Sequence, residues 1–366
     1  MDRGGLERQL FYLLRAMDRD RYQPAVVVWN YHDDDIHLPE LAKLGIPVYS
    51  FPSADRRKTK LKRLRALLRE LRPEVIHSYS FYTNIAASWA AWGTGTIPVG
   101  SVRSDFNWAK RESGPVLGRL SARWPRNQIC NSESALRSAQ AFPGFFAPKV
   151  AGVVRNGVDF QTFRVWPVLA DAPARILGIG YLLPVKRWER LLTAIQAVRL
   201  KGLNCTVRIA GDGPLSLVLR RQTRELGIDD CVEFIGHRAD IPGLLAQASF
   251  VVHTADSEGC PNAVLEAMAC GRAVIATDAG DISLLVQNGK TGFVVPRHDP
   301  AALVDCIARL IVDRTLCETM GQAARAEAER EFGLDRLVQD TLGFYQRAGW
   351  QDVLSDGRSE SVHTDH

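Results

Sequence analysis

The segment from residue 257 to residue 271 contains two glutamates at a spacing that suits ligand binding. It reads Ser-Glu-Gly-Cys-Pro-Asn-Ala-Val-Leu-Glu-Ala-Met-Ala-Cys-Gly and follows an apolar, strand-like run at 250–253. Pro261 suits the first turn of a helix, which places Glu258 in the preceding loop and Glu266 on the helix, with seven residues between them. Two carboxylates placed in this way could hold two sets of hydroxyls on one ligand, and the helix N-terminus between them suits a phosphate.

Each of these residues also has an ordinary structural interpretation. Glu258 could be a surface charge, and Glu266 could be a solvent-facing helix residue. Lys186 follows another strand-like run and could bind a diphosphate, although a lysine in a loop is commonly just solvated. The glycine-containing turns at 156–159 and 211–214 also follow strand-like runs and, taken singly, are ordinary tight turns.

The elements that must position these residues are short β-branched runs alternating with amphipathic stretches, a pattern typical of βαβ units and parallel sheets. The runs predict strands at 25–29, 74–77, 98–102, 128–130, 150–154, 175–179, 206–210, 232–236, 249–253, 273–277 and 292–295. The stretch 165–173 has two prolines and no periodicity, so it is interpreted as an interdomain linker. We therefore predict an α/β protein of two doubly wound domains, with a ligand in the cleft between them.

Gly4 and Gly5 precede a helical pattern of leucines, as in the glycine turn and first helix of a βα unit. Because only three residues precede Gly4, the strand that should lead into this turn is not in the sequence. We expect the first domain to lack this strand, from a chain truncated by about 10–15 residues. The alternative is a domain that begins with a helix. A continuous, fully paired sheet in the first domain would contradict the expectation.

The composition is that of an ordinary globular protein. The 366 residues are 46% hydrophobic and 24% charged, and the chain is long enough for two domains. No apolar run approaches the ~20 residues of a membrane span, and the N-terminus has no signal-like apolar stretch. The seven cysteines are scattered and form no C-x-x-C pair, so neither a zinc site nor a disulfide framework is expected. These features favour a cytoplasmic location.

The net charge of +5 is unevenly distributed. Residues 1–166 carry 25 Lys and Arg against 15 Asp and Glu, whereas residues 167–366 carry 21 against 26. Much of the positive excess lies between residues 56 and 72, at Arg56, Arg57, Lys58, Lys60, Lys62, Arg63, Arg65, Arg69 and Arg72. This segment could be a solvated helix face, or a surface that contacts anionic lipid or a phosphorylated acceptor.

Three motifs of other protein classes are incomplete. The run 178–183 has two glycines of a dinucleotide-binding G-x-G-x-x-G and lacks the third. The run 284–291 ends like a phosphate-binding loop but begins with leucine instead of glycine. Asp33, Asp34 and Asp35 contain a D-x-D metal motif, but in a different architecture from the one that uses it. We therefore expect no metal, no other cofactor and no nucleic-acid partner.

In their order along the chain, these residues resemble the family 4 glycosyltransferases (glycosyl transferases group 1). The resemblance covers nearly the whole sequence and rests on Gly4-Gly5 before Leu6-Glu7-Arg8-Gln9, Pro73–His77, Asn156–Asp159, Lys186, Gly211–Pro214, Glu258 with Glu266, and Thr291-Gly292. It implies the GT-B fold, in which two Rossmann-like domains face each other across a cleft. The acceptor domain would span 1–165, the nucleotide-sugar domain 166–330, and a helix at 331–350 would return to the first domain. We expect the polar tail at 351–366 to be disordered.

The resemblance implies a retaining enzyme that moves a sugar from a nucleotide-sugar donor to a glycan or lipid-linked acceptor. The pathway would be cell-surface polysaccharide or glycolipid synthesis. The acceptor could then lie at the inner face of the membrane, which the basic first domain would allow the enzyme to contact. As catalytic residues, Lys186 would neutralise the donor diphosphate, Glu258 would hold the donor sugar and Glu266 the ribose. Other donor-binding positions would be Gly4, Gly5, Tyr181, Arg187, Gly236, His237, Arg238, Gly259, Cys260, Pro261, Asn262 and Ala263.

Two positions depart from the family's pattern. Tyr181 stands where the family usually has an arginine, and Arg187 could supply the missing cation. A histidine often found near the donor sugar is replaced within residues 102–105. There, Arg103 or Asp105 could contact the sugar or the acceptor, or form a structural loop pair. The alternative function is therefore a non-catalytic sugar-nucleotide or glycan-binding protein of the same fold, and donor turnover would separate the two.

Overall fold

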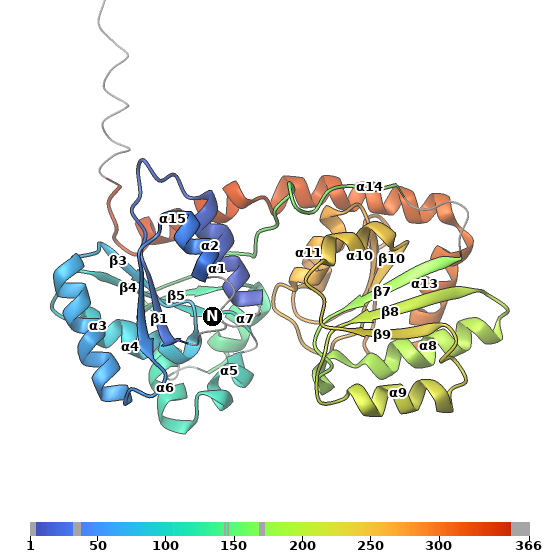
Figure 1. Ribbon diagram of the computed structural model, residues 1–366, viewed down its shortest axis with the longest axis horizontal. Helices are drawn as coiled ribbons and strands as arrows, with labels where there is room; N and C mark the ends of the chain where they lie inside the picture. The colour runs from blue at the N-terminus through green and yellow to red at the C-terminus, as the bar shows by residue number, and fades with distance from the viewer. Residues whose placement is uncertain are drawn as a thin grey trace, which may run out of the picture. The chain divides into compact units, whose positions relative to one another are not determined.

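The computed structural model describes residues 5–31, 38–104, 106–142, 144, 146–167 and 173–352. The chain forms two compact units (Figure 1). The first unit comprises residues 1–157 together with 334–366, and the second comprises residues 158–333. The division after Gly157 lies ahead of the boundary expected at 165. Residues 168–172 of the predicted linker, 353–366 of the predicted tail and the acidic run at 33–35 lie outside the described residues.

The second unit is built on one six-stranded parallel sheet. Its strands are β7 (Ala174–Ile179), β8 (Cys205–Ala210), β9 (Val232–Gly236), β10 (Phe250–His253), β11 (Ala273–Thr277) and β12 (Gly292–Val295). They lie in the order β12-β11-β10-β7-β8-β9. This is a doubly wound order, in which the chain builds outward from β7 and then returns to build outward from β10. The carboxyl ends of these two neighbouring strands are where folds of this kind bind ligands.

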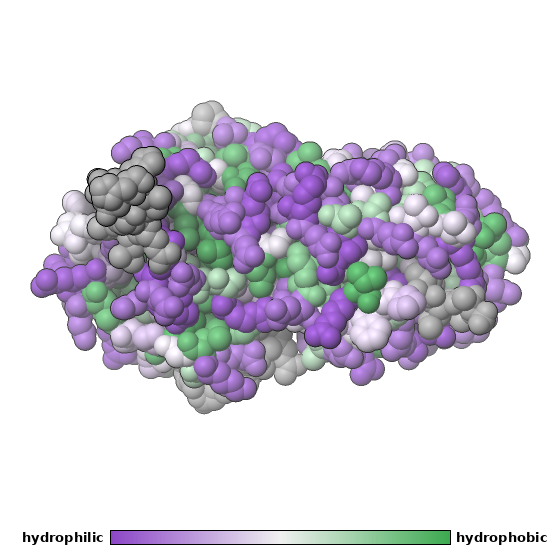
Figure 2. Space-filling model, turned by 90° about the horizontal axis from the view of Figure 1, so that it is seen from above, coloured by the Kyte–Doolittle hydropathy of each residue, from purple (hydrophilic) through white to green (hydrophobic). Residues whose placement is uncertain are grey.

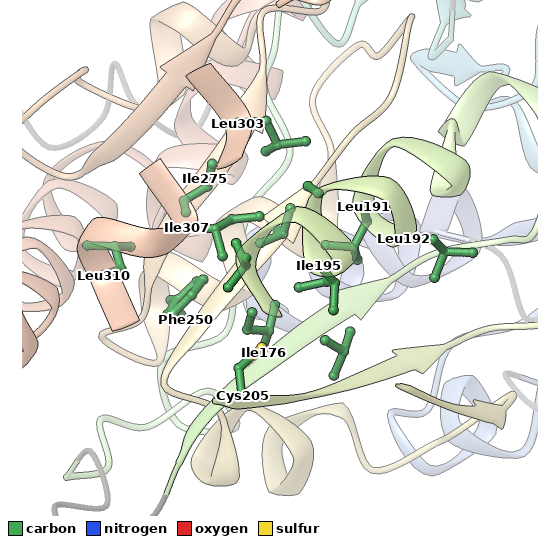
Figure 3. Packing of buried hydrophobic residues seen from close by; sticks show 14 of the residues in the cluster. Ile176, Leu191, Leu192, Ile195, Cys205, Phe250, Ile275, Leu303, Ile307 and Leu310 are labelled. Carbon is green, nitrogen blue, oxygen red and sulfur yellow. The ribbon is translucent and has the colours of Figure 1, made fainter. Parts of the chain in front are cut away.

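Helices cover both faces of this sheet (Figure 1). One face carries α8 (Trp188–Leu200), α9 (Ser216–Glu225) and α13 (Pro300–Val312), and the other carries α10 (Ile241–Gln247), α11 (Asn262–Ala269) and α12 (Ile282–Leu285). The helix α14 (Arg314–Glu331) contributes to both. Figure 3 shows α8 and α13 packed over the strands through Leu191, Leu192, Ile195, Leu303, Ile307, Leu310, Ile176, Phe250 and Ile275. Burial on this scale, at roughly 1.5–3 kcal/mol for each large apolar side chain, fixes the strand ends that carry the loops.

The first unit contains two parallel sheets. One pairs β1 (Val26–Tyr31) with β2 (Val48–Pro52), and the other has the order β3 (Val75–His77), β4 (Ile97–Val102), β5 (Asn127–Cys130) and β6 (Val150–Val153). The four-stranded sheet packs against α1 (Gly5–Ala16) and α15 (Leu334–Arg347) on one face. Its other face packs against α5 (Phe106–Glu112), α6 (Pro115–Arg123) and α7 (Glu133–Gln140). The two-stranded sheet packs against α2 (Leu38–Lys43), α3 (Arg57–Leu71) and α4 (Asn84–Ala91).

The α/β class and the parallel sheets predicted from the sequence are confirmed. All eleven predicted strands are present within one or two residues of their bounds, and β2 is the only strand of the described residues that was not predicted. The described strands of the first unit form two sheets rather than one continuous sheet. The result that would have contradicted a missing first strand is therefore not observed, and the missing strand stays a prediction.

Among the described helices, none combines the length and the apolar character that crossing a membrane requires. The face drawn in Figure 2 is largely hydrophilic, and its hydrophobic residues lie in small separate groups.

Candidate active site

Three charged or polar side chains meet at the point where the strand order in the sheet of the second unit reverses. Lys186 ends a short 3-10 turn, η2 (Pro184–Lys186), in the loop after β7. His253 is the last residue of β10, and Glu258 lies in the loop that follows it. The Lys186 ammonium pairs with Glu258 Oε1, and His253 Nε2 lies 2.9 Å from the same oxygen. The side chains are 19%, 2% and 12% exposed for Lys186, His253 and Glu258.

The charge state of Glu258 follows from these contacts. Burial would raise the pKa of Glu258, but the Lys186 ammonium and the hydrogen bond with His253 together lower it to about 2. The carboxylate is therefore ionised at neutral pH and can only accept hydrogen bonds. The Nε2–H group of His253 is therefore the donor of the hydrogen bond to Glu258. The result is a preorganised cation and carboxylate at the ligand-binding edge of the sheet.

Backbone contacts between the two loops hold Lys186 in place. The hydroxyl of Thr254 donates to the carbonyl oxygen of Lys186 at 2.9 Å, and the amide of Asp256 donates to that of Val185 at 2.8 Å. Arg190 in turn donates to the carbonyl of Thr254 at 3.0 Å and pairs with Asp256 at 2.6 Å. The loops after β7 and β10 therefore behave as one structure, which fixes the position of the ammonium.

Glycines allow the loops after β7 and β8 to pack closely. Gly211 has a φ of +151°, and a Cβ atom there would lie 2.0 Å from the carbonyl oxygen of Gly180, which no side chain tolerates. Gly211 also donates from its amide to the carbonyl of Gly236 at 2.8 Å. The amide of His237 donates to Asp212 Oδ2 at 3.0 Å. These contacts place Gly236, His237 and the exposed Arg238 at the carboxyl edge of the sheet.

The helix α11 begins at Asn262, so Pro261 is the residue before the helix and not part of its first turn. Gly259, Cys260 and Pro261 are buried, whereas Asn262 and Ala263 are partly exposed at the helix N-terminus. Glu266 lies one turn inside the helix and is 3% exposed. The interpretation of Glu266 as a solvent-facing residue is therefore wrong, as is that of Glu258 as a surface charge.

Tyr181 and Arg187 occupy different environments. Tyr181 is 51% exposed in the loop after β7. Arg187 pairs with Glu189 at 2.6 Å and with Asp256 at 3.5 Å, so two carboxylates already share its charge. To bind a diphosphate as a second cation, Arg187 would have to give up or rearrange these ion pairs. This role of Arg187 stays a prediction.

The predicted positions of the first unit are described only in part. Gly5 is the first residue of α1, while Gly4 and Asp105 lie outside the described residues. Arg103 follows β4 directly, and its guanidinium carbon lies 4.1 Å from the centroid of the Tyr79 ring. Its Nη1 donates to Asn156 Oδ1 at 3.3 Å.

His253 is the site residue that the sequence analysis missed. It was assigned only to a buried strand. A histidine at the carboxyl end of an apolar strand, five residues before Glu258, was the signal that could have identified it. A polar residue at that end of a parallel strand faces the ligand edge of the sheet.

Comparison with known proteins covers both units. Residues 3–162 match the family model described as Glycosyltransferase Family 4, and residues 173–313 match that described as Glycosyl transferases group 1. N-acetyl-alpha-D-glucosaminyl L-malate synthase of Bacillus anthracis is 26% identical over 194 residues, which are 53% of this chain and 49% of the relative. The GDP-mannose-dependent alpha-(1-6)-phosphatidylinositol monomannoside mannosyltransferase of Mycobacterium tuberculosis is 30% identical over 207 residues, 51% and 54% respectively. The matches thus span about half the length of these relatives.

A solved structure resembles the chain over nearly its full length. HepE from Anabaena in complex with UDP-glucose has a TM-score of 0.79 and 21% sequence identity. The match covers 94% of this chain and 97% of that protein. At this level of identity the likeness shows a shared fold.

Proposed function

We propose that this chain, which belongs to the family 4 glycosyltransferases (glycosyl transferases group 1) and has their GT-B fold, transfers a sugar from a nucleotide-sugar donor to a glycan or lipid-linked acceptor. The observation that carries the proposal is the ion pair of Lys186 with Glu258, which His253 also contacts. This pair lies where the strand order of a doubly wound sheet reverses. Two relatives support a nucleotide-sugar donor: HepE was solved with UDP-glucose, and the mycobacterial enzyme is named as GDP-mannose-dependent.

In the proposed reaction, the bond between the sugar C1 and the diphosphate oxygen breaks. The acceptor hydroxyl oxygen bonds to C1 on the same face, and its proton passes to the leaving diphosphate, so the anomeric configuration is retained. Negative charge builds on the diphosphate as the bond breaks. Lys186 and the N-terminus of α11 would stabilise that charge more in the transition state than in the ground state. No metal is needed for this charge balance in the proposed mechanism.

The two glutamates would bind the donor's hydroxyl groups. Glu258 is ionised and held in one orientation, so it can accept hydrogen bonds from sugar hydroxyls without reorganising. Glu266 is proposed to hold the ribose from its buried position on α11. Gly259 to Ala263 lie between the two carboxylates in the chain and would contact the sugar and phosphate through their backbone.

The test is release of free nucleotide from a panel of UDP-, GDP- and ADP-sugars with membrane lipid extract, in the presence of EDTA. We expect release from one donor class, lost in Lys186→Ala, Glu258→Ala and Glu266→Ala. Lys201→Ala is the matched control, because Lys201 forms an exposed pair with Asp305 at 2.9 Å in the same unit. Retention would appear in the anomeric coupling constant of the product. Donor binding without release in the unmodified protein would favour the non-catalytic alternative, and loss of release in EDTA would contradict the metal-free mechanism.

We also propose that α3 contacts an anionic membrane surface. Lys58, Lys62, Arg65 and Arg69 are spaced by four, three and four residues, which places them along one side of the helix, and Arg72 directly follows the last residue of the helix. Each basic residue near an anionic leaflet contributes about 1 kcal/mol. The cytoplasmic location and the polysaccharide or glycolipid pathway stay predictions.

Tryptophans lie beside this basic stripe. Trp89 of α4 and Trp92 just after it are 39% and 77% exposed. Arg65 donates to the carbonyl of Trp89 at 3.0 Å and its guanidinium lies 5.3 Å from the Trp89 ring centroid. Tryptophan favours the membrane–water interface, so the pairing supports a lipid partner.

Lys60 does not belong to this surface, which corrects the assignment made from the charge run. It is 2% exposed, and its ammonium donates to Asn30 Oδ1 at 2.7 Å and to the carbonyl of Trp29 at 3.0 Å. Its ammonium group is therefore hydrogen-bonded inside the first unit and does not face the surface.

A further inference from the structure

Four polar side chains converge at the carboxyl edge of the four-stranded sheet in the first unit. Tyr79 follows β3, Arg103 follows β4, Asn131 follows β5 and Asn156 follows β6, each within three residues of its strand's end. Contacts connect them. Arg103 stacks on the Tyr79 ring, donates to Asn156 Oδ1 at 3.3 Å, and accepts at its carbonyl from Asn131 Nδ2 at 3.1 Å. This edge of a parallel sheet is where such folds bind ligands.

Three atoms of this cluster are buried and have no hydrogen-bond partner among the residues that the structure describes: the Tyr79 hydroxyl, Arg103 Nε and Asn131 Oδ1. Tyr79 is 8% exposed and Asn131 is 4% exposed, so bulk water does not satisfy them. Leaving a buried polar group unpaired is costly, and most native proteins avoid it. Three such atoms, all on residues that follow strands of the same sheet, indicate a place where a polar ligand completes the hydrogen bonding.

The cluster carries a net positive charge. Among the described residues, no carboxylate pairs with Arg103, whose charged end contacts only an amide oxygen and an aromatic ring. Burial and the nearby Arg103 charge lower the pKa of His77 to about 3, so this neighbour is neutral. Burial also raises the pKa of Tyr345, whose hydroxyl lies 2.8 Å from His77 Nδ1, so it is neutral too. A partly buried guanidinium that pairs with no carboxylate among the described residues is stabilised by an anion.

We propose that this edge binds an oxyanion, the phosphate or carboxylate group of a substrate, on Arg103. The Arg103 guanidinium pairs with the oxyanion, and the Tyr79 hydroxyl donates to it. An oxyanion also matches the fork of N–H donors that arginine presents, which lysine lacks. The binding stands on the first unit alone. Its assignment to the acceptor rests on the proposed glycosyl transfer, and implies an acceptor that carries an anionic group.

The test observes Arg103 directly, without a donor. The Nε–Hε resonance of Arg103, assigned by its absence in Arg103→Gln, is followed during titration with methyl phosphate, acetate or glycerol at constant ionic strength in chloride. We expect a saturable shift with methyl phosphate or acetate and none with glycerol. The tighter of the two anions identifies the ligand class. No shift with either anion, or an equal shift with glycerol, would overturn the proposal.

Variants separate binding from folding. Tyr79→Phe keeps the ring under the guanidinium and removes only the hydroxyl, and we expect it to weaken binding by roughly tenfold, as for one lost charge-assisted hydrogen bond. Calorimetry with the tighter anion should show no binding to Arg103→Gln and unchanged binding to Arg63→Gln, whose arginine is exposed and paired with Asp55 in the same unit. Binding to Arg103→Gln equal to that of the unmodified protein would place the anion elsewhere. If the unmodified protein releases no nucleotide while anion binding follows this pattern, the proposed transfer is wrong and the oxyanion site stands.

Discussion

The ion pair between Lys186 and Glu258 makes a prediction about stability that does not depend on the reaction. In Lys186→Met the carboxylate keeps its buried position and loses its cation. Removing one partner of a fully buried pair costs about 3–5 kcal/mol. The two side chains retain 19% and 12% exposure, so we expect about 2–3 kcal/mol at pH 7.

The pH dependence of this cost has a defined sign. In the unmodified protein the pKa of Glu258 is about 2, below its ordinary 4.5, because the cation and His253 outweigh burial. The group therefore stabilises the fold fully above about pH 4.5, and this contribution is lost as the pH falls toward 2. In Lys186→Met burial becomes dominant and raises the pKa of Glu258. The variant is then destabilised at neutral pH and recovers, relative to the unmodified protein, as the pH falls and Glu258 takes up a proton.

The assay is urea unfolding at pH 7 and pH 5, followed by the fluorescence of Trp188. This side chain is 1% exposed, lies in the second unit two residues from Lys186, and its transition is identified by comparison with Trp188→Phe. We expect the difference in free energy of unfolding between Lys186→Met and the unmodified protein to be smaller at pH 5 than at pH 7. The double variant Lys186→Met/Glu258→Gln should recover most of the loss, because no unpaired charge remains. An equal difference in free energy of unfolding at both pH values, or a double variant as unstable as the single one, would refute the electrostatic reasoning.

Two further predictions concern the membrane contact and the histidine. Vesicles containing anionic lipid should bind the protein in a salt-sensitive manner. Lys62→Glu with Arg69→Glu should weaken that binding by at least about tenfold, and Trp92→Ala by less. Co-sedimentation with the vesicles measures the bound fraction of the protein, and equal binding to neutral vesicles would contradict the prediction. His253→Phe removes a hydrogen bond that lowers the pKa of Glu258, so the acid limb of the nucleotide-release profile should move to higher pH, whereas His253→Gln can still donate and should move it less. Identical pH profiles for the two variants would show that the histidine only fills space.

The sequence predicted the strands well because buried parallel strands are apolar along their whole length. The pattern at 273–277 is an example, since all five residues are buried. The missed strand β2 has only one buried residue in five, contains Ser50 and ends at Pro52, so it does not show this pattern. Such a strand is indicated by its partner, β1, rather than by its own residues.

Lys186, Glu258 and Glu266 were proposed from the sequence as site residues, whereas His253 and the contacts between these side chains were not. The spacing of Glu258 and Glu266 predicted a loop carboxylate and a helix carboxylate, and the structure shows this arrangement. Nothing in the spacing predicted that Lys186, 72 residues earlier, pairs with Glu258. Nor did it predict that Arg187 pairs with Glu189 and Asp256. Contacts of this kind depend on side-chain directions in two separate loops, which no local pattern encodes.

The strand order explains why these distant residues are nevertheless neighbours. In a doubly wound sheet the first and fourth strands lie side by side, although two strands and their helices separate them in the chain. Here they are β7 and β10, and the loops that follow them carry Lys186 and Glu258. A cation after the first strand and a carboxylate after the fourth therefore meet whenever this topology forms. The histidine that ends β10 then adds a donor to the same carboxylate oxygen, so the topology determines the meeting place and His253 determines the orientation of Glu258.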